Sequence, residues 1–163
     1  MSGVELSGAA EVILRLQEMG TAARRAVGAV VAEEAAALQA DIRARIGTGE
    51  FFKDPNDRVR QALWSSVEDD GTAVTGAVGA KPIVLGNGFN LAAGLEYGTA
   101  AHDIVVRKAK ALAFVLGGTL MFRQRVHHPG TRAYHFVTGP FAERRERIRE
   151  RIAAAVAITG ESP

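Results

Sequence analysis

The chain contains no cysteine, and that absence excludes several classes of protein at once. Disulfide-stabilised folds, thiolate metal sites and cysteine catalysis all require a thiol, so none of them applies here. Long hydrophobic runs are absent as well, since no segment approaches the roughly 18 apolar residues of a membrane-spanning helix. The first residues lack both a basic region and an unbroken apolar stretch, which argues against a secretory signal peptide. We therefore expect no membrane partner, and a protein that stays in the cytoplasm or in a particle assembled there.

The charge that is present is nearly balanced overall but is unevenly distributed along the chain. Up to Asp103 there are nine lysines and arginines against fourteen acidic residues, whereas from Ile104 onward there are eleven against four. The first part thus carries a net charge of −5 and the second +7, which together make the overall +2. Such a polarity suits a head-to-tail contact, in which an acidic surface of one copy meets a basic surface of another. The alternative is that the basic excess merely forms a solvated helix.

A long amphipathic helix is predicted in the first third of the sequence. Apolar residues recur there in steps of three and four from Val12 to Ile46, as one face of a helix requires. Gly20 interrupts the pattern, and the segment 47–49 ends it. A helix over residues 21–46 alone would be roughly 39 Å long at about 1.5 Å per residue. That length is large for so small a domain, so we expect part of the helix to pack outside its own subunit.

Short apolar runs separated by turn residues predict antiparallel strands in the rest of the chain. Leu63–Val67 and Thr72–Val78 flank an Asp-Gly turn, and the Gly117-Gly118 pair predicts a second hairpin. Residues 50–60 and 79–90 are rich in turn residues and predict loops. The predicted strands of the second half are Ile104–Val106, Leu112–Leu116 and Leu120–Val126.

A helix over Pro140–Ile158 completes the predicted elements. Proline favours a helix start, and a single apolar stripe follows it. Residues 159–163 are expected to fray. Together these elements predict one domain over residues 1–163 with an α+β fold. In that fold the long N-terminal helix and the C-terminal helix pack on one face of an antiparallel sheet of about four or five strands.

No arrangement of polar residues predicts an enzyme, a metal site or a cofactor site. The four histidines are His102, His127, His128 and His135. They lack the helical spacing that fixes a metal site. Glu96 has no nucleophile near it except Thr99, so it is better suited to hydrogen-bond a backbone turn, or an arginine across an interface. The arginines between residues 144 and 151 alternate with glutamates, which indicates a solvated helix face rather than a nucleic-acid site.

The order of short motifs between Leu95 and Phe136 carries the strongest functional signal. These motifs are Glu96-Tyr97-Gly98-Thr99, His102-Asp103-Ile104, Lys110-Ala111-Leu112-Ala113-Phe114, His128-Pro129-Gly130-Thr131 and Tyr134-His135-Phe136. Their order and spacing resemble the tail-completion or neck proteins of long-tailed phages, the family that includes the minor tail protein Z type of component. The resemblance covers about residues 20–157. It departs from the family pattern where Ala101 and His135 stand in place of prolines.

The resemblance implies a structural virion protein. It implies a homo-oligomeric ring, expected to be hexameric, at the head–tail junction or the tail end of the particle. The neighbouring proteins would be a head-closure or connector protein and a tail-terminator or tail-tube protein, and DNA would pass through the lumen without sequence-specific binding. The alternatives are a tail terminator or head-closure protein of the same connector, and a small nucleic-acid-binding protein.

We expect the subunit interface to be formed by polar turn residues and by two arginines of the second hairpin. In the family, the turn that contains His128 lies next to the subunit contact. Arg123 and Arg125 are predicted to point from one face of the strand Leu120–Val126, because side chains alternate along a strand. The predicted interface residues are Glu96, Tyr97, Gly98, Thr99, His102, Arg123, Arg125, His128, Pro129, Gly130 and Thr131.

Overall fold

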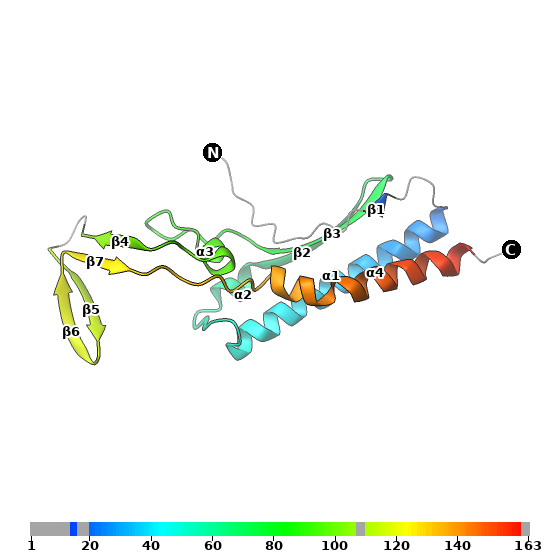
Figure 1. The fold of residues 1–163 in the computed structure, drawn as a ribbon. Coiled ribbons are helices and arrows are strands. Elements are labelled where there is room, and N and C mark those ends of the chain that lie inside the picture. The colour runs from blue at the N-terminus through cyan, green and yellow to red at the C-terminus, as the bar shows by residue number, and fades with distance from the viewer. Residues whose placement is uncertain (1–13, 16–19, 107–109, 161–163) are drawn as a thin grey trace.

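The computed structural model describes residues 14–15, 20–106 and 110–160, which form an elongated molecule of helices and antiparallel strands (Figure 1). Its helices are α1 (Thr21–Thr48), α2 (Arg58–Ala62), α3 (Leu91–Tyr97) and α4 (Thr138–Gly160). Its strands are β1 (Leu14–Arg15), β2 (Leu63–Asp69), β3 (Ala73–Ala80), β4 (His102–Val105), β5 (Leu112–Leu116), β6 (Thr119–Arg123) and β7 (Arg125–His128). The predicted α+β class is confirmed. Within the described ranges, no helix is long and apolar enough to cross a membrane.

The body of the molecule consists of α1, α4 and a sheet with the strand order β1-β3-β2. α1 ends at Gly49, whose left-handed backbone (φ 75°) lets its N–H bond the last carbonyl groups of the helix. The predicted apolar stripe of α1 is confirmed, and its buried members are Val27, Val31, Ala35, Leu38, Ile42 and Ile46. They belong to two hydrophobic clusters that include residues of the sheet and of α4. The stripe is therefore covered within its own chain by the sheet and α4. The expectation that part of the helix packs outside the subunit stays a prediction for the other faces of α1.

An ionic network also fixes α4 on α1. The side chain of Glu34 is only 3% exposed, and Arg151 donates to its carboxylate at 2.5 Å. Arg144 and Arg147 approach the same carboxylate at 3.9 and 3.7 Å. Because a buried carboxylate is costly unless it is paired, these arginines satisfy a charge that α1 brings into the helix contact. The prediction of a solvated basic face is therefore incomplete, since part of the arginine run faces α1.

The strands do not form one sheet, so the prediction of a single sheet of four or five strands is not confirmed. The described residues form a three-stranded sheet and two separate two-stranded sheets, β4-β7 and β5-β6. The predicted strand Leu120–Val126 is split at Gln124, so that β6 pairs with β5 while β7 pairs with β4. Leu14–Arg15 were predicted to be helical but pair with β3. The rest of the predicted helix before Gly20 lies outside the described residues.

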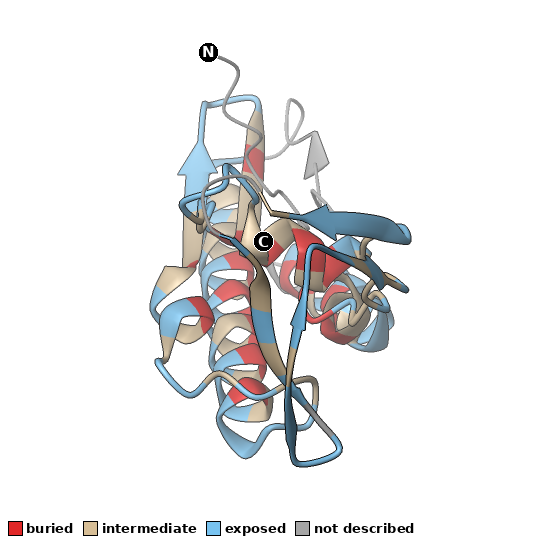
Figure 2. Cartoon of the chain, turned by 90° about the vertical axis from the view of Figure 1, so that its left-hand side faces the viewer, coloured by how far each residue is buried: buried red, intermediate tan, exposed pale blue. Residues whose placement is uncertain are grey.

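The two small sheets form an extension that we call the β-arm, residues 102–128, of which 102–106 and 110–128 are described. Figure 1 shows the β-arm reaching away from the body, with the β5–β6 hairpin at its far end. Figure 2 views the molecule from the side of the β-arm, and its buried residues gather in the body while the β-arm is largely exposed. The predicted turn at Gly117-Gly118 is confirmed, and both glycines have the positive φ angles that such a turn needs.

Candidate subunit interface

The predicted interface begins at Glu96, which the structure places in the interior. Glu96 lies near the end of α3 and is only 1% exposed. Its Oε2 accepts a hydrogen bond from the Val137 N–H at 2.9 Å, and its Oε1 accepts from the N–H and the hydroxyl of Thr138 at 3.1 and 2.6 Å. Because α4 begins at Thr138, the carboxylate caps the N-terminal end of that helix, where the helix dipole favours a negative charge. The expectation that Glu96 bonds a backbone turn is confirmed, and its charge does not lie on the surface of the subunit.

The two glycine-threonine motifs of the predicted interface meet at the base of the β-arm. Thr99 and Thr131 form an isolated antiparallel bridge, with N–H···O distances of 2.9 and 3.2 Å. Gly98 and Gly130 have φ angles of 75° and 91°. A Cβ atom on Gly98 would lie 2.7 Å from the Thr131 carbonyl oxygen, and one on Gly130 would clash with the Thr99 carbonyl. Each turn thus needs glycine for its backbone angle and for the close approach of the other turn.

Two backbone hydrogen bonds and two aromatic contacts tie this base to the body. The N–H groups of Tyr134 and His135 donate to the carbonyl groups of Leu95 and Glu96 at 2.9 and 3.2 Å. The ring of Phe52 also makes edge-on contacts with Tyr134 and Phe136, each with 5.5 Å between centroids. The segment before α4 is therefore held against α3 and against the loop that follows α1.

The two faces of the β4–β7 sheet carry different polar groups. On one face the rings of His102 and His128, which are cross-strand partners, lie 5.1 Å apart. On the other face Asp103 forms an ion pair with Arg125 and a 3.0 Å contact with His127 Nδ1. The hydrogen bond from Arg125, and then that from His127, lowers the pKa of Asp103 below its ordinary value. Within the described ranges, no group of three or more histidine, aspartate or glutamate side chains is placed to hold a metal ion.

The remaining predicted interface residues do not form one cluster. Tyr97 and Pro129 are exposed near the base of the β-arm. Arg123 and Arg125 belong to different strands, because the chain changes partner at Gln124. Their predicted alignment on one face of a single strand is therefore wrong. Arg125 is engaged by Asp103, whereas Arg123 donates to the backbone carbonyl of its neighbour Phe122 at 2.9 Å.

Sequence reasoning missed the apolar surface of the β-arm. In the β5–β6 hairpin, Val115, Leu120 and Phe122 are 68%, 56% and 58% exposed, and Ile104 and Val105 are exposed on β4. The sequence contains a pattern that could have predicted this surface. Large apolar residues stand at successive positions of the hairpin, and side chains at successive positions lie on opposite faces of a two-stranded sheet. A hairpin that packs one face on a core would instead alternate apolar and polar residues.

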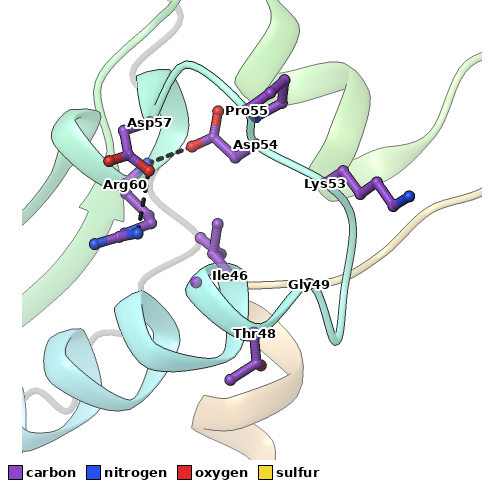
Figure 3. Close-up of a pocket in the computed structure, with 9 residues that line it drawn as sticks. Ile46, Thr48, Gly49, Lys53, Asp54, Pro55, Asp57 and Arg60 are labelled. Atoms are coloured by element: carbon purple, nitrogen blue, oxygen red, sulfur yellow. Dashed lines mark hydrogen bonds and ion pairs between the residues drawn. The ribbon is translucent and has the colours of Figure 1, made fainter.

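A pocket of about 380 Å³ lies in the body, between the end of α1 and the start of α2 (Figure 3). Both of its carboxylates are already engaged. Asp54 accepts hydrogen bonds from the N–H groups at the start of α2, and Asp57 pairs with Arg60 at 3.1 Å. The carboxylate of Asp54 thus stabilises a short helix, and nothing in this arrangement resembles a nucleophile with a base.

Comparison with known proteins finds no significant match to this chain among family models, curated protein sequences or solved structures.

Proposed function

We propose that this chain is a structural subunit of a long-tailed phage or phage-like particle, where it assembles into a ring at the head–tail junction or at the tail end. The observation that carries the proposal is the β-arm, whose large apolar side chains are left exposed by the described part of the chain. Burying such a side chain contributes about 1.5–3 kcal/mol, so a subunit that exposes several of them gains considerably from a protein neighbour.

The shape of the subunit supports assembly into a ring rather than a symmetric dimer. The β-arm lies at one end of the elongated molecule, and the turn between β2 and β3 lies near the other (Figure 1). A contact between unlike ends is heterologous, and copies joined in this way form a ring when their rotation closes. We propose a hexamer, located in the virion after assembly in the host cytoplasm. Its partners are head-closure or connector proteins and tail-terminator or tail-tube proteins, and DNA passes through its lumen without sequence-specific binding.

The phage assignment itself is supported by the order of the motifs between Leu95 and Phe136. Two of these motifs meet at the base of the β-arm, where the positive φ angles at positions 98 and 130 require glycine. A recurring set of motifs is easier to understand when its members cooperate in one local structure. A tail terminator or head-closure protein of the same connector would use the same β-arm and differ only in its place in the particle.

A nucleic-acid-binding role has weaker support. Arg144, Arg147 and Arg151 of the basic helix α4 form ion pairs with acidic residues of α1. The described part of α4 therefore presents no uniform positive stripe that could bind a phosphate backbone. The proposed role also requires neither catalysis nor a cofactor.

Deletion of the gene, followed by electron microscopy of the particles, tests the proposal. We expect unjoined heads and tails, or tails with an unfinished end, and restoration by the wild-type gene supplied in trans. Averaging of wild-type particle images at the neck without imposed symmetry is expected to show six copies of the chain. A monomer or an isologous dimer at that position would contradict the ring, and complete infectious particles without the gene would contradict the structural role. The identity of the neighbouring genes is a simpler test, and a portal, major capsid or major tail gene close to this gene would support the assignment.

A further inference from the structure

The β5–β6 hairpin lacks the support that a two-stranded sheet needs. An isolated hairpin is marginally stable in water, and this one exposes the large apolar side chains of Val115, Leu120 and Phe122, which the strand register places on one face. Its two outer edges are also unpaired, since within the described ranges β5 and β6 bond only to each other. The hairpin therefore needs a partner that can cover apolar side chains and accept a strand edge.

The body carries an open strand edge of the matching kind. β2 is the outermost strand of the sheet β1-β3-β2, and no described strand pairs with its outer side. Val67 in this strand is exposed. An open edge with an apolar residue invites the addition of a further strand, a common way for proteins to bind extended segments.

The charges of the two elements are complementary. β2 ends in the exposed acidic residues Glu68 and Asp69, and Asp70 follows. Among the described residues, Glu68 has no ion-pair partner, and neither does Arg123 at the end of β6, nor Lys110 just before β5. An acidic strand end on the body and basic residues on the β-arm favour contact between copies, and they disfavour contact between two β-arms.

We propose that the β5–β6 hairpin of one copy adds to the outer edge of β2 in the next copy, with Arg123 facing Glu68. The occupant of the open edge is thus a second copy of this chain. The hairpin cannot reach β2 of its own copy, because the β-arm extends away from the body (Figure 1). Adding its two strands to the three of the body makes a five-stranded sheet that two copies share. The inference rests on the proposed function for the closure of the ring, but the contact itself is testable on the purified chain.

Cross-linking between single-cysteine variants tests the contact, and the cysteine-free chain makes every introduced thiol unique. Leu120→Cys places the thiol on the hairpin, and Val67→Cys places it on β2. One variant carries a size tag, the two are mixed, and a bismaleimide is added. We expect the mixed product at several times the yield obtained with the control Ala153→Cys, an exposed position on α4. Equal yields with the control, or a Leu120→Cys homodimer as the main product, would overturn the inference.

A charge exchange tests the pair of Arg123 and Glu68. Arg123→Glu and Glu68→Arg are each expected to weaken self-association about tenfold in sedimentation experiments, because each places like charges opposite one another. The double variant is expected to restore most of the association. Both residues are exposed, so the melting temperature of every variant should match that of the wild type at protein concentrations at which the chain is monomeric. A double variant as weak as the single variants would refute the proposed pairing.

The failure of this inference can be told apart from the failure of the proposed function. If the cross-link forms but particles are complete without the gene, then the contact is correct and the phage role is wrong. If Leu120→Asp prevents completion of particles while no cross-link forms at any concentration, then the β-arm binds a different protein of the particle. In that case the inference about a second copy is wrong and the structural role stands.

Discussion

Replacing Glu96 with glutamine is the most informative single change in this chain. The substitution preserves size but converts one carboxylate oxygen into an NH₂ group, which donates hydrogen bonds instead of accepting them. Both oxygens of Glu96 are used, one by the Val137 N–H and the other by the N–H and hydroxyl of Thr138. The glutamine oxygen can take only one of these places. The new NH₂ group must then face a buried donor.

The expected cost follows from these contacts. Leaving a buried donor without an acceptor costs about 1–3 kcal/mol. Losing the negative charge at the start of α4 adds about 0.3–1 kcal/mol, because the carboxylate lies at the positive end of the helix dipole. We expect Glu96→Gln to lower the free energy of unfolding by about 3 kcal/mol. For a chain of this size that corresponds to a fall in Tm of about 6–12 °C.

Thermal unfolding followed by circular dichroism measures this change, and Glu143→Gln is the matched control. Glu143 is also a glutamate near the start of α4, but its side chain is 57% exposed and paired with Arg45 at 2.7 Å. An exposed pair contributes about 0–1 kcal/mol, so the control should melt close to the wild type. If Glu96→Gln melts no lower than Glu143→Gln, the capping role of Glu96 is refuted. If Glu96→Gln melts like the wild type but still fails to complete particles, Glu96 would act at the subunit contact instead.

Three further predictions concern the base of the β-arm, its charges and metal ions. Gly98→Val and Gly130→Val are each expected to abolish soluble folded protein, because a β-branched side chain strains the positive φ angle and meets backbone atoms of the opposite turn. The control Gly28→Ala, at a helix position with open space, should express normally and melt at a slightly higher temperature. Arg125→Gln should raise the carboxyl pKa of Asp103 towards its ordinary value of 3.8 in an NMR titration. In the wild type the lowered pKa means that the stabilisation by this pair is present above pH 3.8 and is lost as the pH falls through the folded-state pKa. An Asp103 titration that is unchanged in the variant would contradict the pairing. Treatment with a chelator should leave the Tm unchanged, and stoichiometric zinc in elemental analysis would contradict the prediction that the chain needs no metal ion.

The elements that could be predicted from the sequence are those encoded by neighbouring residues. The apolar stripe of α1 follows a period of three and four, and the hairpin of β2 and β3 surrounds an Asp-Gly turn. Both appear close to their predicted positions. α3 was missed because it is a short helix, Leu91–Tyr97, with a glycine inside it. Its capping residue Asn90, whose side chain accepts from the Ala93 N–H, was a usable signal.

The features that could not be predicted depend on which segments meet. Alternation along Leu120–Val126 is the same whether the segment is one strand or two, so it gave no sign that the chain changes partner at Gln124. Leu14–Arg15 fit a helical period, yet they pair with β3 through a contact distant in sequence. In the candidate interface, the motifs located Gly98 and Gly130 correctly as special turns. Only the structure shows that the two turns pack against each other.

The division between a hydrogen-bonded base and an exposed β-arm is consistent with the proposed assembly into a ring. In the proposed ring, the direction in which the β-arm leaves the body sets the rotation from one copy to the next, and a ring closes only when that rotation is the same at every contact. Glu96 joins the end of α3 to the start of α4. Next to Glu96 in the sequence, the bridge of Thr99 and Thr131 joins the segment that enters the β-arm to the segment that leaves it. The base is thus fixed by buried or short-range contacts that no neighbour needs to supply. In the proposed ring, the hairpin beyond it gains its stability from the next copy, so that folding of the body and completion of the β-arm are separate events.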